Sequence, residues 1–238
     1  MKIEITAHPA WVEELVAFLE PYGQRITQHE FFGAMADGSL GLERWQRALV
    51  HFYPLIETFP QYMALNLAKV PAGSSIWNNR ARHWLILNIG QERVHANWWK
   101  QWAKGFGVPG DMLEQEVHPP ASMDAINSYL WRVCSYGSLA EGMSATNFAV
   151  EGPTGQWTKR IKDALLSYRG MPGVDINEKT MAWVAAHADY DDLHPHEALE
   201  VIKAFAITPE EQMRVRQAAK RAMEYYAMAL DCCMRVDN

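Results

Sequence analysis

Two segments of the chain place histidine and carboxylate side chains at spacings that bring them together on a helix. Glu92 and His95 are three residues apart, which is roughly 60° around a helix, so both side chains can reach one point. His187, Asp191 and His194 are spaced i, i+4 and i+7, which on one continuous helix makes a stripe two turns long. Imidazole and carboxylate groups together suit iron, zinc or manganese. Each segment alone is also compatible with a structural histidine or a solvated charged face.

A third candidate ligand is Glu151, which follows the apolar stretch Ala145–Val150 and precedes Gly152 and Pro153. Buried acids are rare unless they are paired or bound to a metal. On its own, Glu151 is also compatible with an acid at a helix end. With the two other segments it becomes a candidate for a ligand that bridges two ions.

The number of candidate donors indicates how many ions they could hold. One zinc ion needs three or four protein ligands, so six donors from three segments fit two ions better. Three carboxylates against two Fe(II) ions leave a surplus of one positive charge, which favours an anionic substrate and open positions for dioxygen. The candidate metal ligands are Glu92, His95, Glu151, His187, Asp191 and His194.

Three neighbours of His194 are assigned outside this ligand set. On a continuous helix, His196 and Asp192 lie away from the stripe, on the opposite face or behind the ligands. Pro195 removes one helix hydrogen bond and could bend the chain where His194 must point inward.

The composition restricts the class of protein that positions these residues. The chain has 238 residues, 49% of them apolar, and 22 basic against 28 acidic residues give a net charge of −6. This composition excludes general disorder and disfavours nucleic acid as a partner. Three cysteines form no disulfide framework, which indicates a reducing cytoplasm. Without a signal-peptide pattern or an apolar run of about 18 residues, we expect a cytoplasmic protein that does not span a membrane.

Helical periodicity, divided by proline and glycine, covers most of the chain, and no convincing alternating strand pattern occurs. We therefore expect one all-α domain over residues 1–238, a bundle of about seven helices. Pro54 and Pro60 predict a kink in the third stretch, and Pro195 lies inside the seventh. The predicted helical stretches are 10–20, 21–36, 42–69, 75–104, 120–136, 138–168, 177–206 and 208–234.

Taken together, these residues resemble the haem-oxygenase-like di-iron oxidases, which share the fold of the TenA and PqqC proteins. Members pair a Glu and a His on one helix, a Glu on the next, and a His-x-x-x-Asp-x-x-His set on a third. Here the pattern reads Glu92 and His95, then Glu151, then His187 with Asp191 and His194. The resemblance implies a haem-oxygenase-like fold and two Fe(II) ions, the second at a labile site, with dioxygen as co-substrate. It assigns no catalytic residue beyond the ligands and no substrate contact.

Within this family, longer segments are similar to the members that convert medium-chain fatty acids into 1-alkenes. These segments are Arg82–His95, Ala145–Gly152 and His187–Pro195. The resemblance implies an oxidative decarboxylation, in which the fatty-acid carboxylate docks at the metal, a β-hydrogen is removed, and loss of carbon dioxide leaves a terminal alkene. It also implies a small-molecule carboxylate substrate and an external electron donor as partners, and it is compatible with a homo-oligomer.

Other members of the same fold remain as alternatives. Some act on an amino acid or amine by N-oxygenation, desaturation or carbon–carbon cleavage, and a charged pair deep in the pocket would favour these over a fatty acid. Members that form para-aminobenzoate sacrifice a tyrosine in a His-x-x-Tyr segment, where this chain has Phe32 after His29. Thiaminase-type members use a cysteine near residues 148–151, and the nearest one here is Cys134. A regulatory protein without enzyme activity is disfavoured by the acidic charge and by the lack of a DNA-reading helix motif.

Overall fold

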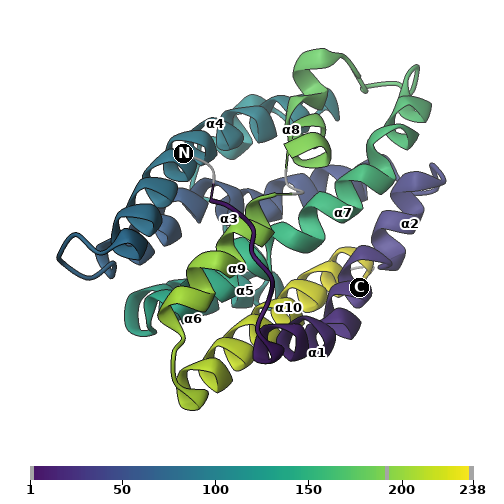
Figure 1. The fold of residues 1–238 in the computed structure, drawn as a ribbon. Coiled ribbons are helices and arrows are strands. Elements are labelled where there is room, and N and C mark those ends of the chain that lie inside the picture. Colours follow the sequence, from purple (N-terminus) through teal and green to yellow (C-terminus); the bar gives the residue numbers. More distant parts are fainter. Residues whose placement is uncertain (1–2, 191–192, 236–238) are drawn as a thin grey trace.

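The computed structural model describes residues 3–190 and 193–235, without the side chain of Tyr190, and Figure 1 shows its arrangement. Within that part of the chain every regular element is a helix, which confirms the predicted all-α class. The predicted ligand Asp191 and its neighbour Asp192 lie outside the described residues. The α-helices are α1 (Ala10–Thr27), α2 (Glu30–Ala36), α3 (Leu42–Ala68), α4 (Ile76–Gly105), α5 (Ala121–Tyr136), α6 (Leu139–Met143), α7 (Glu151–Lys162), α8 (Glu178–Tyr190), α9 (His194–Phe205) and α10 (Pro209–Met234).

The first helix passes through a proline that the sequence analysis placed at a boundary. The predicted break at Pro21 is wrong, because α1 continues through it to Thr27. An internal proline removes one helix hydrogen bond, and here the buried side chains of Leu19 and Ile26 hold both flanks against the core. The boundary instead falls before α2, where the ring of His29 accepts a hydrogen bond from the backbone N–H of Phe31.

The second difference lies beside the predicted ligands. The stretch 177–206 is not one helix, since α8 ends at Tyr190 and α9 begins at His194. Pro195 occupies the first turn of α9, where a missing backbone N–H leaves no helix bond unmade. The stripe calculated for a continuous helix therefore does not apply to His194, which stands at the start of a separate helix.

The predicted segment 138–168 is divided as well. A π-helical turn, Ser144–Phe148, links the short α6 to α7, and a 3-10 turn, Ala164–Tyr168, follows α7. The interruption predicted at Gly152 and Pro153 lies earlier, because both residues belong to the first turn of α7. With α2 and α6 short and 177–206 divided, the described chain has ten α-helices where about seven were expected.

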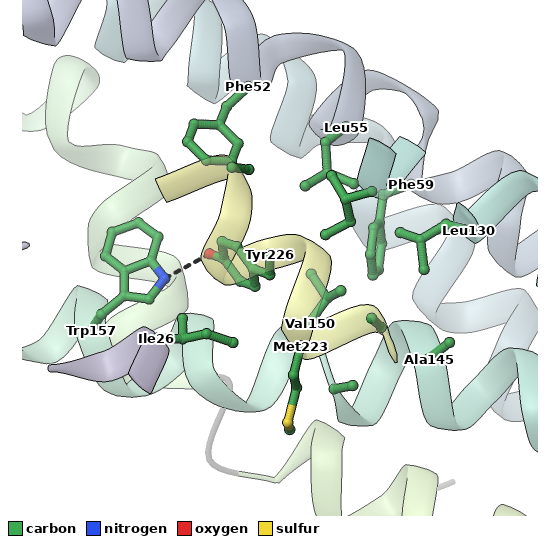
Figure 2. Close-up of a cluster of buried hydrophobic side chains, with 14 of the residues drawn as sticks. Ile26, Phe52, Leu55, Phe59, Leu130, Ala145, Val150, Trp157, Met223 and Tyr226 are labelled. Atoms are coloured by element: carbon green, nitrogen blue, oxygen red, sulfur yellow. Dashed lines mark hydrogen bonds between the residues drawn. The ribbon is translucent and has the colours of Figure 1, made fainter. Parts of the chain in front are cut away.

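The core lies where α3, α5, α7 and α10 meet. Figure 2 shows this cluster, in which the Trp157 indole N–H donates to the Tyr226 hydroxyl at 2.8 Å. Around this core α4 packs on α3 and α8, and α7 also packs on α8, which brings the helices that carry the predicted ligands together. The buried side chains labelled in the cluster include Ile26, Phe52, Leu55, Phe59, Leu130, Val150, Trp157, Met223 and Tyr226.

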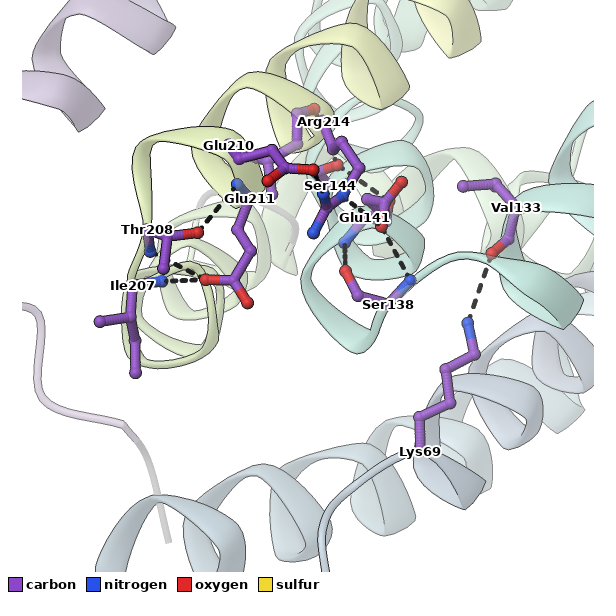
Figure 3. A network of polar contacts seen from close by, with 11 residues as sticks. Lys69, Val133, Ser138, Glu141, Ser144, Ile207, Thr208, Glu210, Glu211 and Arg214 are labelled. Carbon is purple, nitrogen blue, oxygen red and sulfur yellow. Dashed lines mark hydrogen bonds and ion pairs between the residues drawn. The ribbon is translucent and has the colours of Figure 1, made fainter.

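Two capping boxes fix the end of the bundle where α6 and α10 begin, as Figure 3 shows. Ser138 and Glu141 exchange hydrogen bonds at the start of α6, and Thr208 and Glu211 do the same at the start of α10. The predicted stretch 208–234 is confirmed as α10, with Thr208 as its N-cap.

Polar contacts connect α10 to α6 and to the π-helical turn. Arg214 of α10 lies 2.7 Å from Glu210 and 3.6 Å from Glu141, and the Ser144 hydroxyl lies 3.1 Å from the Val215 carbonyl oxygen. The start of the turn that leads to Glu151 is therefore held against α10.

No helix in the described ranges is both long and apolar enough to cross a membrane. This agrees with the absence of a long apolar run in the sequence.

Candidate metal centre

The first ligand pair lies in the middle of α4, a helix of 30 residues whose N-terminus is capped by the Ser75 side chain. Glu92 and His95 are both buried, with 7% and 8% of their surfaces exposed. His95 Nδ1 lies 2.7 Å from Glu92 Oε2, so the two side chains form a hydrogen bond. The i, i+3 spacing thus brings an imidazole and a carboxylate to one point inside the bundle, as predicted.

His187 of α8 lies opposite this pair, with its ring centroid 4.6 Å from that of His95. Its Nδ1 is 2.8 Å from the carbonyl oxygen of Trp183, so Nδ1 carries the hydrogen and donates it. This bond leaves Nε2 as the basic nitrogen of the neutral ring, the usual arrangement of a histidine that binds a metal. Burial, followed by the neighbouring His95, lowers the pKa of His187 well below its ordinary value.

Glu151 is the first residue of α7 and follows the π-helical turn. Its Oε1 accepts a hydrogen bond of 2.6 Å from the side-chain amide of Asn147, whose carbonyl oxygen is 3.0 Å from the Thr146 hydroxyl. Its Oε2 lies 3.8 Å from Nδ1 of His194. π-Helical turns occur frequently at functional sites, and this one orients a buried carboxylate toward a histidine from another helix.

His194, the first residue of α9, is mostly buried, and 17% of its side chain is exposed. Burial lowers the pKa of this imidazole, while the carboxylates of Glu92 and Glu197 act in the opposite direction. The ring of Trp84 approaches it edge to face at 6.2 Å. His194 therefore lies within electrostatic range of the α4 pair as well as close to Glu151.

The sequence analysis missed Glu197, a buried acid three residues after His194. Its Oε2 accepts a hydrogen bond of 2.8 Å from the Trp84 indole, and its Oε1 accepts one of 3.1 Å from the backbone N–H of Ile3. Figure 1 shows the N-terminal segment lying along α9. The i, i+3 spacing to His194 is a signal that could have identified Glu197, but its partners come from distant parts of the chain.

Five of the six predicted ligands thus meet between α4, α7, α8 and α9, and the sixth, Asp191, lies outside the described residues. In the described ranges, no three histidine, cysteine or acidic side chains are already close enough to hold an ion. A metal would have to displace the proton between Glu92 and His95 and draw the remaining donors inward. Three imidazoles and two carboxylates, all largely buried, are donors that fit iron.

A largely apolar cavity adjoins these ligands. Glu92, Glu151 and His187 form part of its wall, and the remaining polar groups are Thr154, Tyr226 and indole nitrogens. No Arg, Lys or Asp appears among the described residues that line it. The apolar part of the wall includes Met35, Trp45, Trp99 and Trp102.

Comparison with known proteins identifies the family and the fold. Residues 46–227 match the model of a family described as iron-containing redox enzymes. A TenA homologue from Pseudomonas syringae pv. tomato is 30% identical, has a TM-score of 0.89, and covers 99% of this chain and 100% of its own. A TenA homologue from Pyrococcus furiosus, at 18% identity and a TM-score of 0.75, covers 94% of this chain and 99% of its own and shows the same fold.

A curated relative carries a functional name. The 4-aminobenzoate synthase of Nitrosomonas europaea is 23% identical over 215 residues, which is 87% of this chain and 85% of that protein. The family match covers well over half of the chain and includes the α4 pair, Glu151, His187 and His194. The chain therefore belongs to the iron-containing redox enzymes with a haem-oxygenase-like fold.

Proposed function

We propose that the protein is an iron- and dioxygen-dependent oxidase that decarboxylates a medium-chain fatty acid to a terminal alkene and carbon dioxide. The observation that supports this substrate class is the apolar wall of the cavity beside Glu92, Glu151 and His187. A hydrocarbon chain needs no polar partner in such surroundings. A buried ammonium group would need a carboxylate partner, and the carboxylates of the described wall, Glu92 and Glu151, are assigned here to the metal.

The residues that would hold iron are Glu92, His95, Glu151, His187 and His194, together with Asp191. The family is described as iron-containing, and iron bound here would supply the activation of dioxygen. A second ion would use Glu151 and His194, with Asp191 nearby in sequence. The fatty-acid carboxylate would bind at this polar end of the cavity, because a centre of two divalent ions and three carboxylates would keep a surplus of one positive charge.

The protein's own contribution is to position groups and to exclude water. The Trp183 carbonyl fixes the ring of His187, and the Asn147 amide fixes the carboxylate of Glu151. The apolar wall holds the substrate chain so that its carboxylate end, and therefore the β-carbon, stays next to the ligands. One fatty acid, one dioxygen, two electrons and two protons give one alkene, one carbon dioxide and two waters, so an external electron donor is required.

The test is a reaction of the purified protein loaded with Fe(II) under anaerobic conditions. Dodecanoic acid, a reductant and dioxygen are then added, and 1-undecene is measured in the headspace. We expect alkene and oxygen uptake from the wild type and neither above background from Glu151→Ala. Rapid oxygen uptake with an amine or an amino acid, and no alkene from dodecanoic acid, would refute the proposed substrate and favour the amine-oxidising alternative.

A second candidate function is the formation of 4-aminobenzoate. The similarity to the Nitrosomonas protein favours it, as does Tyr226, a buried tyrosine in the cavity wall whose hydroxyl is held by Trp157 and by Thr154 at 3.2 Å. The phenylalanine at position 32, where such members carry the tyrosine that they consume, argues against it. Iron-loaded protein incubated with oxygen and reductant but no fatty acid would release 4-aminobenzoate if this candidate were correct.

A further inference from the structure

A row of aromatic rings leads away from the candidate metal centre. The ring of Trp183 stacks on that of His187 at 3.8 Å, and Trp102 lies parallel to Trp183 at 5.4 Å. Trp45 meets Trp102 edge to face at 5.8 Å, and Tyr168 meets Trp45 at 5.5 Å. Each ring centroid in this row is therefore within 6 Å of the next.

Indole and phenol rings are among the side chains that lose one electron most easily. When such rings lie in contact, an oxidised ring takes an electron from its neighbour, and the oxidising equivalent moves one place along the row. A single-electron oxidant at the ligand His187 would thus meet Trp183 first. From there the contacts offer a continuous route through Trp102 and Trp45 to Tyr168.

Two tryptophans in this row have indole nitrogens without a hydrogen-bond acceptor on the protein. In the described ranges, these are the buried Nε1 atoms of Trp183 and Trp102, whereas Trp45 makes a side-chain hydrogen bond with Tyr168. Leaving a buried donor without a bond costs about 1–3 kcal/mol. An oxidised indole that has no acceptor keeps its proton, so the charge stays mobile and passes to the next ring.

The two other tryptophans that pack against Trp183 differ in this respect. The indole of Trp99 donates to the Leu49 carbonyl at 2.7 Å, and that of Trp157 donates to the Tyr226 hydroxyl at 2.8 Å. Their protons have acceptors, which favours trapping the oxidising equivalent on the ring. The two indoles without a protein acceptor, Trp183 and Trp102, are the first two rings of the row after His187.

The row ends at Tyr168, a buried tyrosine with 1% of its surface exposed. The Tyr168 hydroxyl donates to the carbonyl oxygen of Ala34 at 3.3 Å, close to the end of α2. A phenol releases its proton when it loses an electron, so the last ring needs a base, and the carboxylate of the exposed Asp37 lies within electrostatic range of this phenol. Tyr168 is not part of the cavity wall, which separates it from the substrate.

We propose that Trp183, Trp102, Trp45 and Tyr168 form a relay that carries an oxidising equivalent from the iron site to the buried Tyr168 near the end of α2 when it is not used on the substrate. At each step one electron moves inward from the next ring, and the iron site is reduced by one electron. Tyr168 finally gives up an electron and its phenolic proton, and a soluble one-electron reductant such as a thiol or ascorbate restores it by returning both. The proposal rests on the proposed function, because it requires an oxidising iron site.

The test uses the full chain loaded with Fe(II) and exposed to dioxygen without fatty acid. We expect a tyrosyl radical in the electron paramagnetic resonance spectrum of the wild type and none in Tyr168→Phe, which keeps the ring packing. With dodecanoic acid present, Tyr168→Phe should start at the wild-type rate but inactivate after severalfold fewer turnovers. The matched control is Tyr136→Phe, which removes an exposed tyrosine of α5 and should leave both the radical and the number of turnovers unchanged.

Trp102→Phe tests the middle of the row independently, since phenylalanine fills the space but resists oxidation. It should remove the tyrosyl radical while mass spectrometry finds oxidised Trp183. A wild type that shows no radical, or a Tyr168→Phe variant that inactivates like the wild type, would overturn the relay. Hydrogen peroxide added to the Fe(II)-loaded protein oxidises the site directly, so this arm decides the relay even if the absence of oxygen uptake refutes the proposed function.

Discussion

The two halves of the candidate metal centre are built in different ways. Glu92 and His95 lie in the interior of one unbroken helix, and their contact of 2.7 Å follows from the helix geometry alone. Glu151 and His194 each begin a helix, next to a π-helical turn and to a helix junction respectively, and they lie 3.8 Å apart. The α4 half is therefore fixed locally, whereas the other half depends on what holds two chain breaks in place.

The supports of the second half come from distant parts of the sequence. Asn147 holds Glu151, and the turn that carries Asn147 begins at Ser144, which contacts the Val215 carbonyl of α10. Glu197 holds the start of α9 through Trp84 and Ile3. The comparison indicates that the α4 half tolerates changes elsewhere in the fold, while the junction half is sensitive to them. This is the physical reason to expect a labile second ion.

The largest effect is expected when a ligand from either half is removed. Glu92→Ala and Glu151→Ala should each lower iron-dependent oxygen uptake by more than about 100-fold, because even groups that only orient ligands contribute 10–100-fold. Oxygen consumption with a Clark electrode and iron content after gel filtration measure this. If Glu151→Ala bound two ions and consumed oxygen normally, Glu151 would not belong to the metal centre.

A smaller effect is expected from the amide that orients Glu151. Asn147→Ala removes the bond of 2.6 Å to Oε1 and should weaken binding of the second Fe(II) by about 10–100-fold, while the first ion binds normally. Anaerobic titration with Fe(II) separates the two ions. Asn127→Ala is the matched control, since Asn127 is a buried asparagine of α5 outside the candidate centre. Equal weakening of both ions, or of neither, would contradict the distinction between the halves.

Weakening the hydrogen bonds that hold the start of α9 should have a still smaller effect on iron binding. Glu197→Gln replaces one of the two carboxylate oxygens, which accept hydrogen bonds from Ile3 and Trp84, with an amide nitrogen that cannot accept one. We expect the affinity for the second ion to fall about tenfold, at the lower end for a group that orients a ligand. Glu200→Gln is the control, because Glu200 binds the same N-terminal segment one turn further along α9. If both variants changed iron affinity equally, the effect would be one of general stability.

The same contrast explains how much of the centre could be predicted from sequence. Glu92 and His95 could be paired because the relative position of residues in one helix depends only on spacing. His194 was included for a reason that proved wrong, since the continuous helix assumed over 177–206 is divided before it. Glu197 was missed because its partners, Trp84 and Ile3, are 113 and 194 residues away in the chain. Spacing cannot predict contacts that arise only when distant segments pack.

The smallest effect concerns stability and its dependence on pH. Burial opposes ionisation of Glu200, but bonds from Lys203 and Thr6 outweigh it and hold the pKa of this carboxyl below its ordinary value. A lowered folded-state pKa contributes stability above the unfolded-state pKa of about 4.3, and this contribution is lost as the pH falls through the folded-state value. Glu200→Gln should therefore lower the free energy of unfolding by about 1 kcal/mol at pH 7.

Because glutamine does not titrate, the difference between the two proteins should shrink as the pH falls below about 4.3. Urea unfolding of the iron-free wild type and Glu200→Gln between pH 7 and pH 3 measures it. Glu210→Gln, a change in an exposed acid of α10, is the control and should show a smaller difference. A difference for Glu200→Gln that stays constant over this range would mean that packing, and not the charge of Glu200, ties the N-terminal segment to α9 and so to the junction half of the centre.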